Sequence, residues 1–168
     1  MEIICMDCGQ APLKAQKENI RYLEGGLPNV ILKDILVETC PACGMRFVTI
    51  PRMAELHRLM AKNVILKPGR LANYEITFLR KTLGLDKKTF AAKMHVRLEQ
   101  VSKWETRNAP ATISPSHDLA LRLLVAQGQR FEDYFGEVDA VDFRSTKQPP
   151  PVTLTVRDNH WIKEQLAA

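Results

Sequence analysis

Residues 85–105 read LDKKTFAAKMHVRLEQVSKWE, and this stretch carries the clearest indication of the fold. Apolar residues recur at helical spacing around Phe90 and again around Trp104, which predicts two amphipathic helices. Asp86 is a suitable N-cap for the first helix, and the dipeptide His95-Val96 separates that helix from the second. The stretch therefore predicts two short helices joined by a tight turn.

Further helices are expected on both sides of this pair. Residues 71–83 have helical apolar spacing up to Gly84, a typical helix terminator. Ser114-Pro115 supplies a cap and a proline at the first helical position for a helix through residues 119–125. Residues 131–135 predict a short last element, so the whole middle segment is expected to be helical.

Positive charge is concentrated in the same segment. The chain has a net charge of +5, and residues 67–130 hold twelve Lys or Arg against five Asp or Glu. The segments on either side are close to neutral or acidic. Residues 1–66 hold eight basic and seven acidic residues, and residues 131–168 hold four basic and seven acidic residues. A local basic field attracts a polyanion such as DNA or RNA, and a merely solvated basic surface is the alternative.

Two helices joined by a short turn, with a polar outer face, follow the plan of a helix-turn-helix motif. Residues 85–105 resemble the Cro/repressor (Xre-type) version of this motif, and the resemblance covers about residues 71–127. It implies that the second helix, expected over about residues 98–106, enters the major groove of double-stranded DNA. The chain has His95 where that family often has Gly at the turn, and a histidine adopts positive φ there at some cost.

The expected groove helix carries side chains that can bind base edges. Gln can form two hydrogen bonds with adenine, Lys can reach O6 and N7 of guanine, and Glu can accept from the amino group of cytosine. The candidate base-reading residues are Glu99, Gln100 and Lys103. Basic residues at the starts of the two helices are candidates for phosphate contact: they are Lys87, Lys88 and Arg97. A solvated surface position is the alternative for each.

All four cysteines of the chain lie in two Cys-x-x-Cys-Gly motifs. Two intervening residues let a tight turn aim both sulfurs at one point, and the glycine lets backbone N–H groups donate to thiolate sulfur. Four thiolates suit tetrahedral Zn²⁺ and leave no open coordination position, which makes such a site structural. A rubredoxin-like iron site and a pair of disulfides are the alternatives. The expected ligands are Cys5, Cys8, Cys40 and Cys43.

Short strands are expected around the cysteine motifs. Residues 30–37 are rich in β-branched side chains and predict a strand, with residues 21–23 as its hairpin partner, and residues 45–50 predict another. So small a β unit cannot bury a large core, so the metal must contribute to its folding. The expected fold class is α+β, with a small N-terminal β-rich zinc ribbon and an all-α Cro/repressor-like helix-turn-helix domain.

The expected segments follow one another along the chain. Lys67-Pro68-Gly69 marks the main boundary. Residues 152–156 alternate like a strand that could pair with another subunit or a partner, and a loosely ordered tail is the alternative. The expected divisions are a zinc ribbon at 1–50, a linker helix at 51–69, the helix-turn-helix domain at 70–135 and a C-terminal extension at 136–168.

The order of these parts is similar to that of the MqsA-type antitoxins, which carry a YgiT-type four-cysteine zinc domain before an Xre-type helix-turn-helix. The resemblance covers residues 1 to about 127. It implies a homodimeric autorepressor that binds an inverted-repeat operator of a type II toxin–antitoxin operon. It also implies a toxin partner, an mRNA-cleaving ribonuclease, bound at the zinc domain. Other proteins with this domain order are regulators without a toxin partner.

Several function classes are disfavoured by the sequence. No apolar run approaches the roughly 18–20 residues of a membrane span, and the first residues do not resemble a secretory signal, so a cytoplasmic protein is expected. Nothing indicates a nucleophile elbow, a phosphate loop or an open metal site, so we do not expect an enzyme. A rubredoxin-like electron carrier with an accessory domain and a protein-interaction adaptor without DNA binding are the alternative functions.

Overall fold

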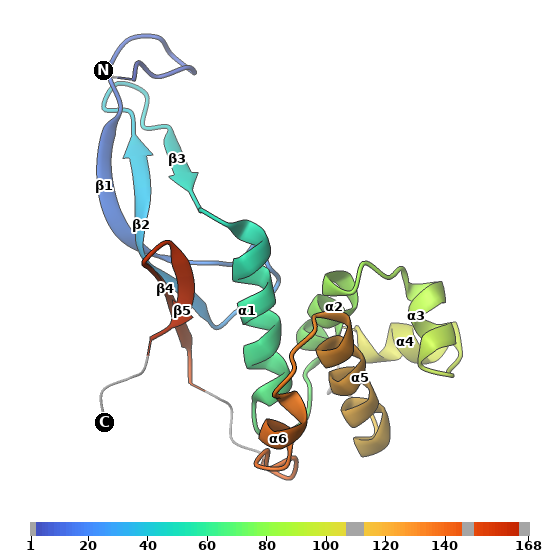
Figure 1. Ribbon diagram of the computed structural model, residues 1–168. Helices are drawn as coiled ribbons and strands as arrows, with labels where there is room; N and C mark the ends of the chain where they lie inside the picture. The colour runs from blue at the N-terminus through green and yellow to red at the C-terminus, as the bar shows by residue number, and fades with distance from the viewer. Residues whose placement is uncertain (1–2, 107–112, 146–149, 165–168) are drawn as a thin grey trace. The chain divides into compact units, whose positions relative to one another are not determined.

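The computed structural model describes residues 3–106, 113–145 and 150–164. These residues form a mixed α+β structure with a five-stranded sheet and six helices, which agrees with the α+β class expected from the sequence (Figure 1). The chain divides into two compact units. The first unit contains the residues up to Tyr22, Asn29–Glu55 and the residues from Pro151 onward, and the second contains Leu23–Pro28 and Leu56–Pro150.

The sheet of the first unit is built around its second strand. The strands are β1 (Lys14–Arg21), β2 (Val30–Thr39), β3 (Arg46–Thr49), β4 (Val152–Arg157) and β5 (His160–Lys163). β2 pairs with β1 on one side and with both β3 and β4 on the other, and β5 adds to β4. The β2–β4 pair is parallel, whereas the other pairs are antiparallel.

A bulge in the middle of β2 sets which of its side chains are buried. The first half of the strand buries even-numbered residues such as Leu32, and the second half buries odd-numbered residues such as Val37. At the change, Asp34 has φ 57° and the register with β1 shifts. The backbone N–H of Asp34 donates to Oδ1 of Asn19 at 3.1 Å. Because one extra residue reverses the alternation, the bulge keeps the apolar residues of both halves in the core.

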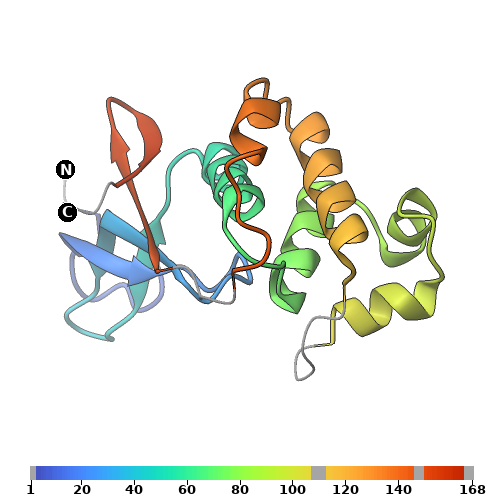
Figure 2. The ribbon, with the colours of Figure 1, turned by 90° about the horizontal axis from the view of Figure 1, so that it is seen from below.

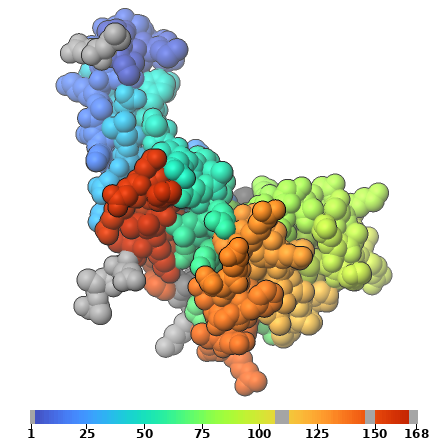
Figure 3. All heavy atoms as spheres, viewed as in Figure 1, coloured from blue at the N-terminus to red at the C-terminus, as the bar shows by residue number. Residues whose placement is uncertain are grey.

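The strand expected near the C-terminus is present, and its partners lie in the same chain. β4 pairs with β2 through Val30–Leu32 and Val152–Leu154, and Figure 3 shows the red β4–β5 hairpin against the side of β2. β3 reaches only the other half of β2, which leaves this edge open for β4. Leu154 and Trp161 are buried, and Nε1 of Trp161 donates to the carbonyl of Pro51 at 2.8 Å. Residues 152–163, expected in a separate C-terminal extension, thus belong to the same unit as the cysteines.

The second unit is helical, and Figure 2 separates its helices by colour. Its helices are α1 (Met53–Leu66, whose first turn belongs to the first unit), α2 (Asn73–Thr82), α3 (Lys87–Lys93), α4 (Leu98–Trp104), α5 (Pro115–Gly128) and α6 (Tyr134–Val138). Asp86 caps α3 through a 2.6 Å bond from the Thr89 N–H, and Ser114 caps α5. α4 ends at Trp104, two residues before the expected end near residue 106.

The helical unit has a core of large apolar side chains and several buried charged groups. The fully buried apolar residues include Ile65, Leu71, Ile76, Leu79, Phe90, Trp104 and Tyr134. The guanidinium of Arg122 is buried among them and donates to the carbonyls of Ile65, Lys67 and Gly69 at 2.7–2.9 Å. This arginine therefore satisfies the backbone of the loop between α1 and α2. No helix among the described residues has both the length and the apolar character to cross a membrane.

Candidate functional site

The four cysteine sulfurs converge on one point. All four Sγ atoms lie within 4.8 Å of one another. The Sγ atoms of Cys5 and Cys43 are 3.8 Å apart, and those of Cys8 and Cys40 are 3.6 Å apart. A tetrahedral metal with M–S bonds of about 2.3 Å requires sulfur separations of about 3.8 Å, so the cluster is close enough to hold a metal ion.

Two turns with the same hydrogen-bond pattern hold the sulfurs in place. The N–H of Gly9 donates to the carbonyl of Cys5 at 2.9 Å, and the N–H of Gly44 donates to that of Cys40 at the same distance. Gly9 has φ 66° and Gly44 has φ 76°. Nothing lies within 4 Å of a Cβ built on either glycine, so the left-handed backbone rather than lack of space favours glycine here.

Two of the cysteines, Cys40 and Cys43, have pKa values shifted in opposite directions. A hydrogen bond from the Cys43 backbone lowers the pKa of Cys40 to about 7. At Cys43 the Met45 backbone N–H acts in the same direction, but burial and the other three thiols together raise the pKa to about 12. All four cysteines are free, and the sulfur separations far exceed the about 2.05 Å of a disulfide. The disulfides considered from the sequence are therefore not formed in the structure.

Apolar side chains are exposed near the cysteine turns. Ile3 is 56 % exposed, Ile4 is 50 % exposed, and Met6, inside the first motif, is 92 % exposed. Met45 follows the second motif and is also exposed. In Figure 1 the first cysteine loop and the loop between β2 and β3 meet at the same end of the strands. The candidate metal centre thus has an apolar surface beside it.

The turn between α3 and α4 orients a polar helix surface. His95 has φ 53°, the left-handed conformation expected for this position. The N–H of Val96 donates to the carbonyl of Ala91 at 3.0 Å, which closes the turn. Val101 and Trp104 of α4 are buried, at 0 % and 1 % exposure, so the opposite face of α4 points away from the core.

The six residues predicted to contact DNA all lie on α3, on α4 or at the start of α4. Lys87 and Lys88 begin α3, Arg97 is the N-cap of α4, and the other three are in α4. Five of the six are exposed, while Gln100 is half-buried. The Nζ atom of Lys87 lies 3.5 Å from Oε2 of Glu105, so this lysine already has an anionic neighbour.

An ion pair that was not predicted from the sequence fixes the end of α4. Arg80 of α2 donates from Nε to Oε1 of Glu105 at 2.6 Å and from Nη2 to Oε2 at 3.2 Å. Both side chains are nearly buried, at 10 % and 4 % exposure. Fork-shaped pairs of this kind restrict orientation as well as distance, so α4 is held against α2.

Two exposed residues of α4 were also absent from the predicted set. Leu98 is 45 % exposed and Ser102 is exposed, and both lie on the surface that carries Glu99 and Lys103. The buried residues Val101 and Trp104 fix which face of α4 is the outer one. Helical spacing from these two residues could have placed Leu98 beside the outer face. It was not selected because leucine is usually assigned to a core.

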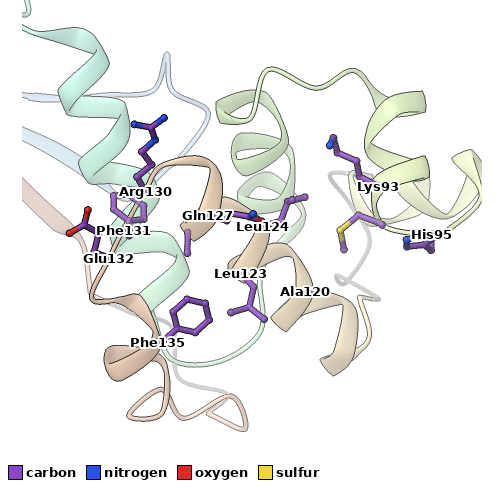
Figure 4. Close-up of a pocket in the computed structure, with 12 residues that line it drawn as sticks. Lys93, His95, Ala120, Leu123, Leu124, Gln127, Arg130, Phe131, Glu132 and Phe135 are labelled. Carbon is purple, nitrogen blue, oxygen red and sulfur yellow. The ribbon is translucent and has the colours of Figure 1, made fainter.

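A hollow of about 760 Å³ lies on the second unit, along α5. Figure 4 shows Ala120, Leu123, Leu124 and Gln127 on α5, with Phe135 of α6 to one side and the α3–α4 turn to the other. Phe135 is 69 % exposed. The hollow is lined by Lys93, Met94, His95, Ala120, Leu123, Leu124, Ala126, Gln127, Arg130, Phe131, Glu132 and Phe135.

No protein-family model matches this chain, and a comparison with curated proteins gives no match. The metal-ligand geometry and the polar helix surface are therefore the basis for a function.

Proposed function

We propose that the protein is a sequence-specific DNA-binding transcriptional regulator with a structural zinc centre, and that it acts as an MqsA-type antitoxin. The observation that carries this proposal is the surface of α4. Val101 and Trp104 anchor one face of the helix in the core, while Glu99 and Lys103 project from the other. In a helix-turn-helix motif this is the arrangement of the helix that enters the major groove.

The dimensions and charge of the α3–α4 region support the proposal. An α-helix with its side chains is about 10–12 Å in diameter and the major groove is about 12 Å wide, so the seven-residue α4 can enter the groove. Lys88 and Arg97 are exposed beside it and would contact phosphates on either side of the groove. In the free protein Lys87 lies 3.5 Å from Glu105. When DNA binds, Lys87 would contact a phosphate instead, so its positive charge has an anionic partner with and without DNA.

Zinc is the proposed metal of the four-cysteine cluster. Zn²⁺ accepts tetrahedral thiolate coordination and supplies folding free energy to small modules without redox chemistry. The sheet of the first unit has few buried residues near the cysteine turns, where Cys5 and Cys40 are themselves buried. Metal analysis of purified protein tests this assignment, because an iron–thiolate centre would be coloured and redox-active whereas zinc is colourless.

A second copy of the chain is the proposed occupant of the hollow along α5. Its floor is apolar, and Arg130 and Glu132 are both exposed and lie two residues apart beside it. In a two-fold arrangement the same surface meets itself, so Arg130 of one copy can face Glu132 of the other. Such a homodimer presents two copies of α4 to an inverted repeat.

The apolar surface at the cysteine turns is the proposed contact for a toxin. Met6 is almost fully exposed beside Ile3 and Ile4, and exposed apolar groups of this kind mark protein-binding surfaces when they are contiguous. The occupant implied by the resemblance is an mRNA-cleaving ribonuclease. A regulator that acts without a toxin would use the same DNA-binding unit.

The decisive experiment is a gel-shift series with the protein's own upstream DNA at several salt concentrations. We expect binding to the upstream DNA that exceeds binding to a scrambled duplex at every salt concentration, and a loss of affinity as salt rises. Lys103→Glu should remove the preference for the upstream sequence. Lys88→Ala should weaken binding to both duplexes equally. Equal affinity of the wild-type protein for both duplexes would contradict the proposal.

A further inference from the structure

One partly exposed apolar side chain lies at the edge of the polar outer face of α4. Leu98 is the first residue of the helix and is 45 % exposed. Residues three and four apart are neighbours on a helix, so Leu98 lies between the buried Val101 and the exposed Ser102, at the border of the outer face, and Glu99 lies in the adjoining row with Lys103. The four exposed residues of this group form one continuous surface.

Leu98 differs from an ordinary surface leucine in its position on the proposed DNA-binding surface. A single exposed leucine is ordinary on a protein surface. This one lies on the surface that enters the groove under the proposed function, so it loses its water when DNA binds. A leucine offers no hydrogen bond, and placing it against a polar base edge would leave that edge without a partner.

The major groove contains one apolar group that can accept such a side chain. Base edges there present hydrogen-bond donors and acceptors, and thymine adds its C5 methyl group. We infer that Leu98 is a specificity-determining residue that selects thymine at one position of each operator half-site, by packing against that methyl group. The inference rests on the proposed function and adds a base preference to it.

The local structure makes Leu98 separable from the fold. Helical side chains point toward the N-terminus of their helix, so Leu98 leads the other exposed residues of α4 into the groove. The buried anchors of the helix are Val101 and Trp104 instead. Alanine has the highest helix propensity, so Leu98→Ala is expected to retain the fold while it removes the contact.

The test uses the full chain and chemically altered DNA. A selection from random duplexes first gives the preferred site of the wild-type protein. Each thymidine of that site is then replaced by deoxyuridine, which removes only the C5 methyl group. We expect one position per half-site where the replacement weakens wild-type binding about fourfold, the factor that one buried methyl-sized group gives. At that position Leu98→Ala should bind thymidine and deoxyuridine duplexes equally.

Leu119→Ala is the matched control, because Leu119 is 38 % exposed on α5, outside the proposed groove surface. This variant should retain the full response to deoxyuridine. A preferred site that does not respond to deoxyuridine at any position, or a response that persists in Leu98→Ala, would overturn the inference and leave the proposed function standing. A selection that enriches no sequence at all would overturn both.

Discussion

The Nε atom of Arg122 donates a 2.6 Å hydrogen bond to Oδ1 of Asp118, one turn earlier on α5, and both side chains are buried. The other carboxylate oxygen of Asp118 accepts from the N–H of Leu71 at 2.7 Å. Together with the three carbonyl contacts of Arg122, this pair ties residues 65–71 to α5. A buried pair of this kind is costly to break because the remaining charge has no water to replace its partner.

Arg122→Met should therefore destabilise the helical unit by about 3–5 kcal/mol. The variant leaves Asp118 charged and buried and removes the donors to three backbone carbonyls. Urea unfolding followed by circular dichroism measures the loss. Lys62→Met is the control, because the side chains of the 3.3 Å Lys62–Glu137 pair are 35 % and 39 % exposed, and it should change the free energy of unfolding by less than about 1 kcal/mol. Equal effects of the two substitutions would contradict the structural role given to Arg122.

His95→Gly should stabilise the protein by about 1 kcal/mol. His95 has φ 53°, a conformation that costs a residue with a Cβ about 1–2 kcal/mol and costs glycine little. The greater freedom of glycine in the unfolded chain offsets part of this gain. Thermal unfolding gives the measurement. Ala92→Gly, one turn earlier in α3, should shift the midpoint in the opposite direction, and a lower midpoint for His95→Gly would show that the turn is not strained.

Metal removal should unfold the sheet unit and leave the helical unit folded. The chain has two tryptophans, with Trp161 in the first unit and Trp104 in the second. In a Trp104→Phe variant, a strong chelator should therefore shift the fluorescence of Trp161 to longer wavelength. In a Trp161→Phe variant, the same chelator should leave the fluorescence of Trp104 unchanged. A Cys40→Ser variant should behave like chelated protein, with less than one metal ion per chain.

The stability of the helical unit should decrease in mild acid because of His57. Burial lowers the pKa of His57, whose ring lies 6.5 Å from that of Phe78 in a T-shaped arrangement. A base with a lowered pKa binds fewer protons in the folded state, so its contribution to stability is full above about pH 6.5 and is lost as pH falls through the folded pKa. His57→Leu should flatten the curve of unfolding free energy between pH 7 and 5. Parallel curves for the two proteins would assign the acid sensitivity to other groups.

Phe135→Glu should dissociate the proposed dimer. Phe135 is 69 % exposed beside the hollow along α5, and a charge there would be buried in the interface. We expect the dissociation constant from sedimentation equilibrium to rise at least about tenfold. Arg130→Glu and Glu132→Arg should each weaken the dimer, and the double variant should recover affinity. A double variant weaker than both single variants would show that these residues do not face each other.

The parts of this fold that local sequence can specify were predicted well. The two Cys-x-x-Cys-Gly motifs require a turn chemistry that only a few residues allow, and the four sulfurs do converge. The caps Asp86 and Ser114 stand at the starts of α3 and α5. The two caps and each separate cysteine turn depend on residues within one turn of each other, where propensity and hydrogen bonding act directly, whereas the meeting of the two turns follows from the preference of four thiolates for one metal.

The features that were not predicted depend on partners far along the chain. β1 begins at Lys14 and not at residue 21, where the hairpin partner of β2 was predicted to begin. Its first residues were not predicted as a strand because most of its side chains are exposed and show no apolar alternation. Strands were predicted at Val30–Leu32 and at Val152–Leu154, but nothing local in either segment indicates that the two strands pair with each other. The Arg80–Glu105 pair likewise joins two helices whose charged residues look like ordinary surface residues. Helical spacing fixed the outer face of α4 only approximately. The apolar Leu98 is therefore more exposed than its residue type suggests, and the polar Gln100 is less exposed.

The pairing of β4 with β2 has a consequence for how the protein forms during synthesis. Val152 leaves the ribosome 122 residues after its partner Val30, which is a delay of about 6–24 s at 5–20 residues per second. The helical unit is synthesised in that interval and can fold first, while the edge of β2 at Val30–Leu32 still lacks its partner strand β4. A nascent chain paused before residue 150 should thus present an unpaired strand to chaperones.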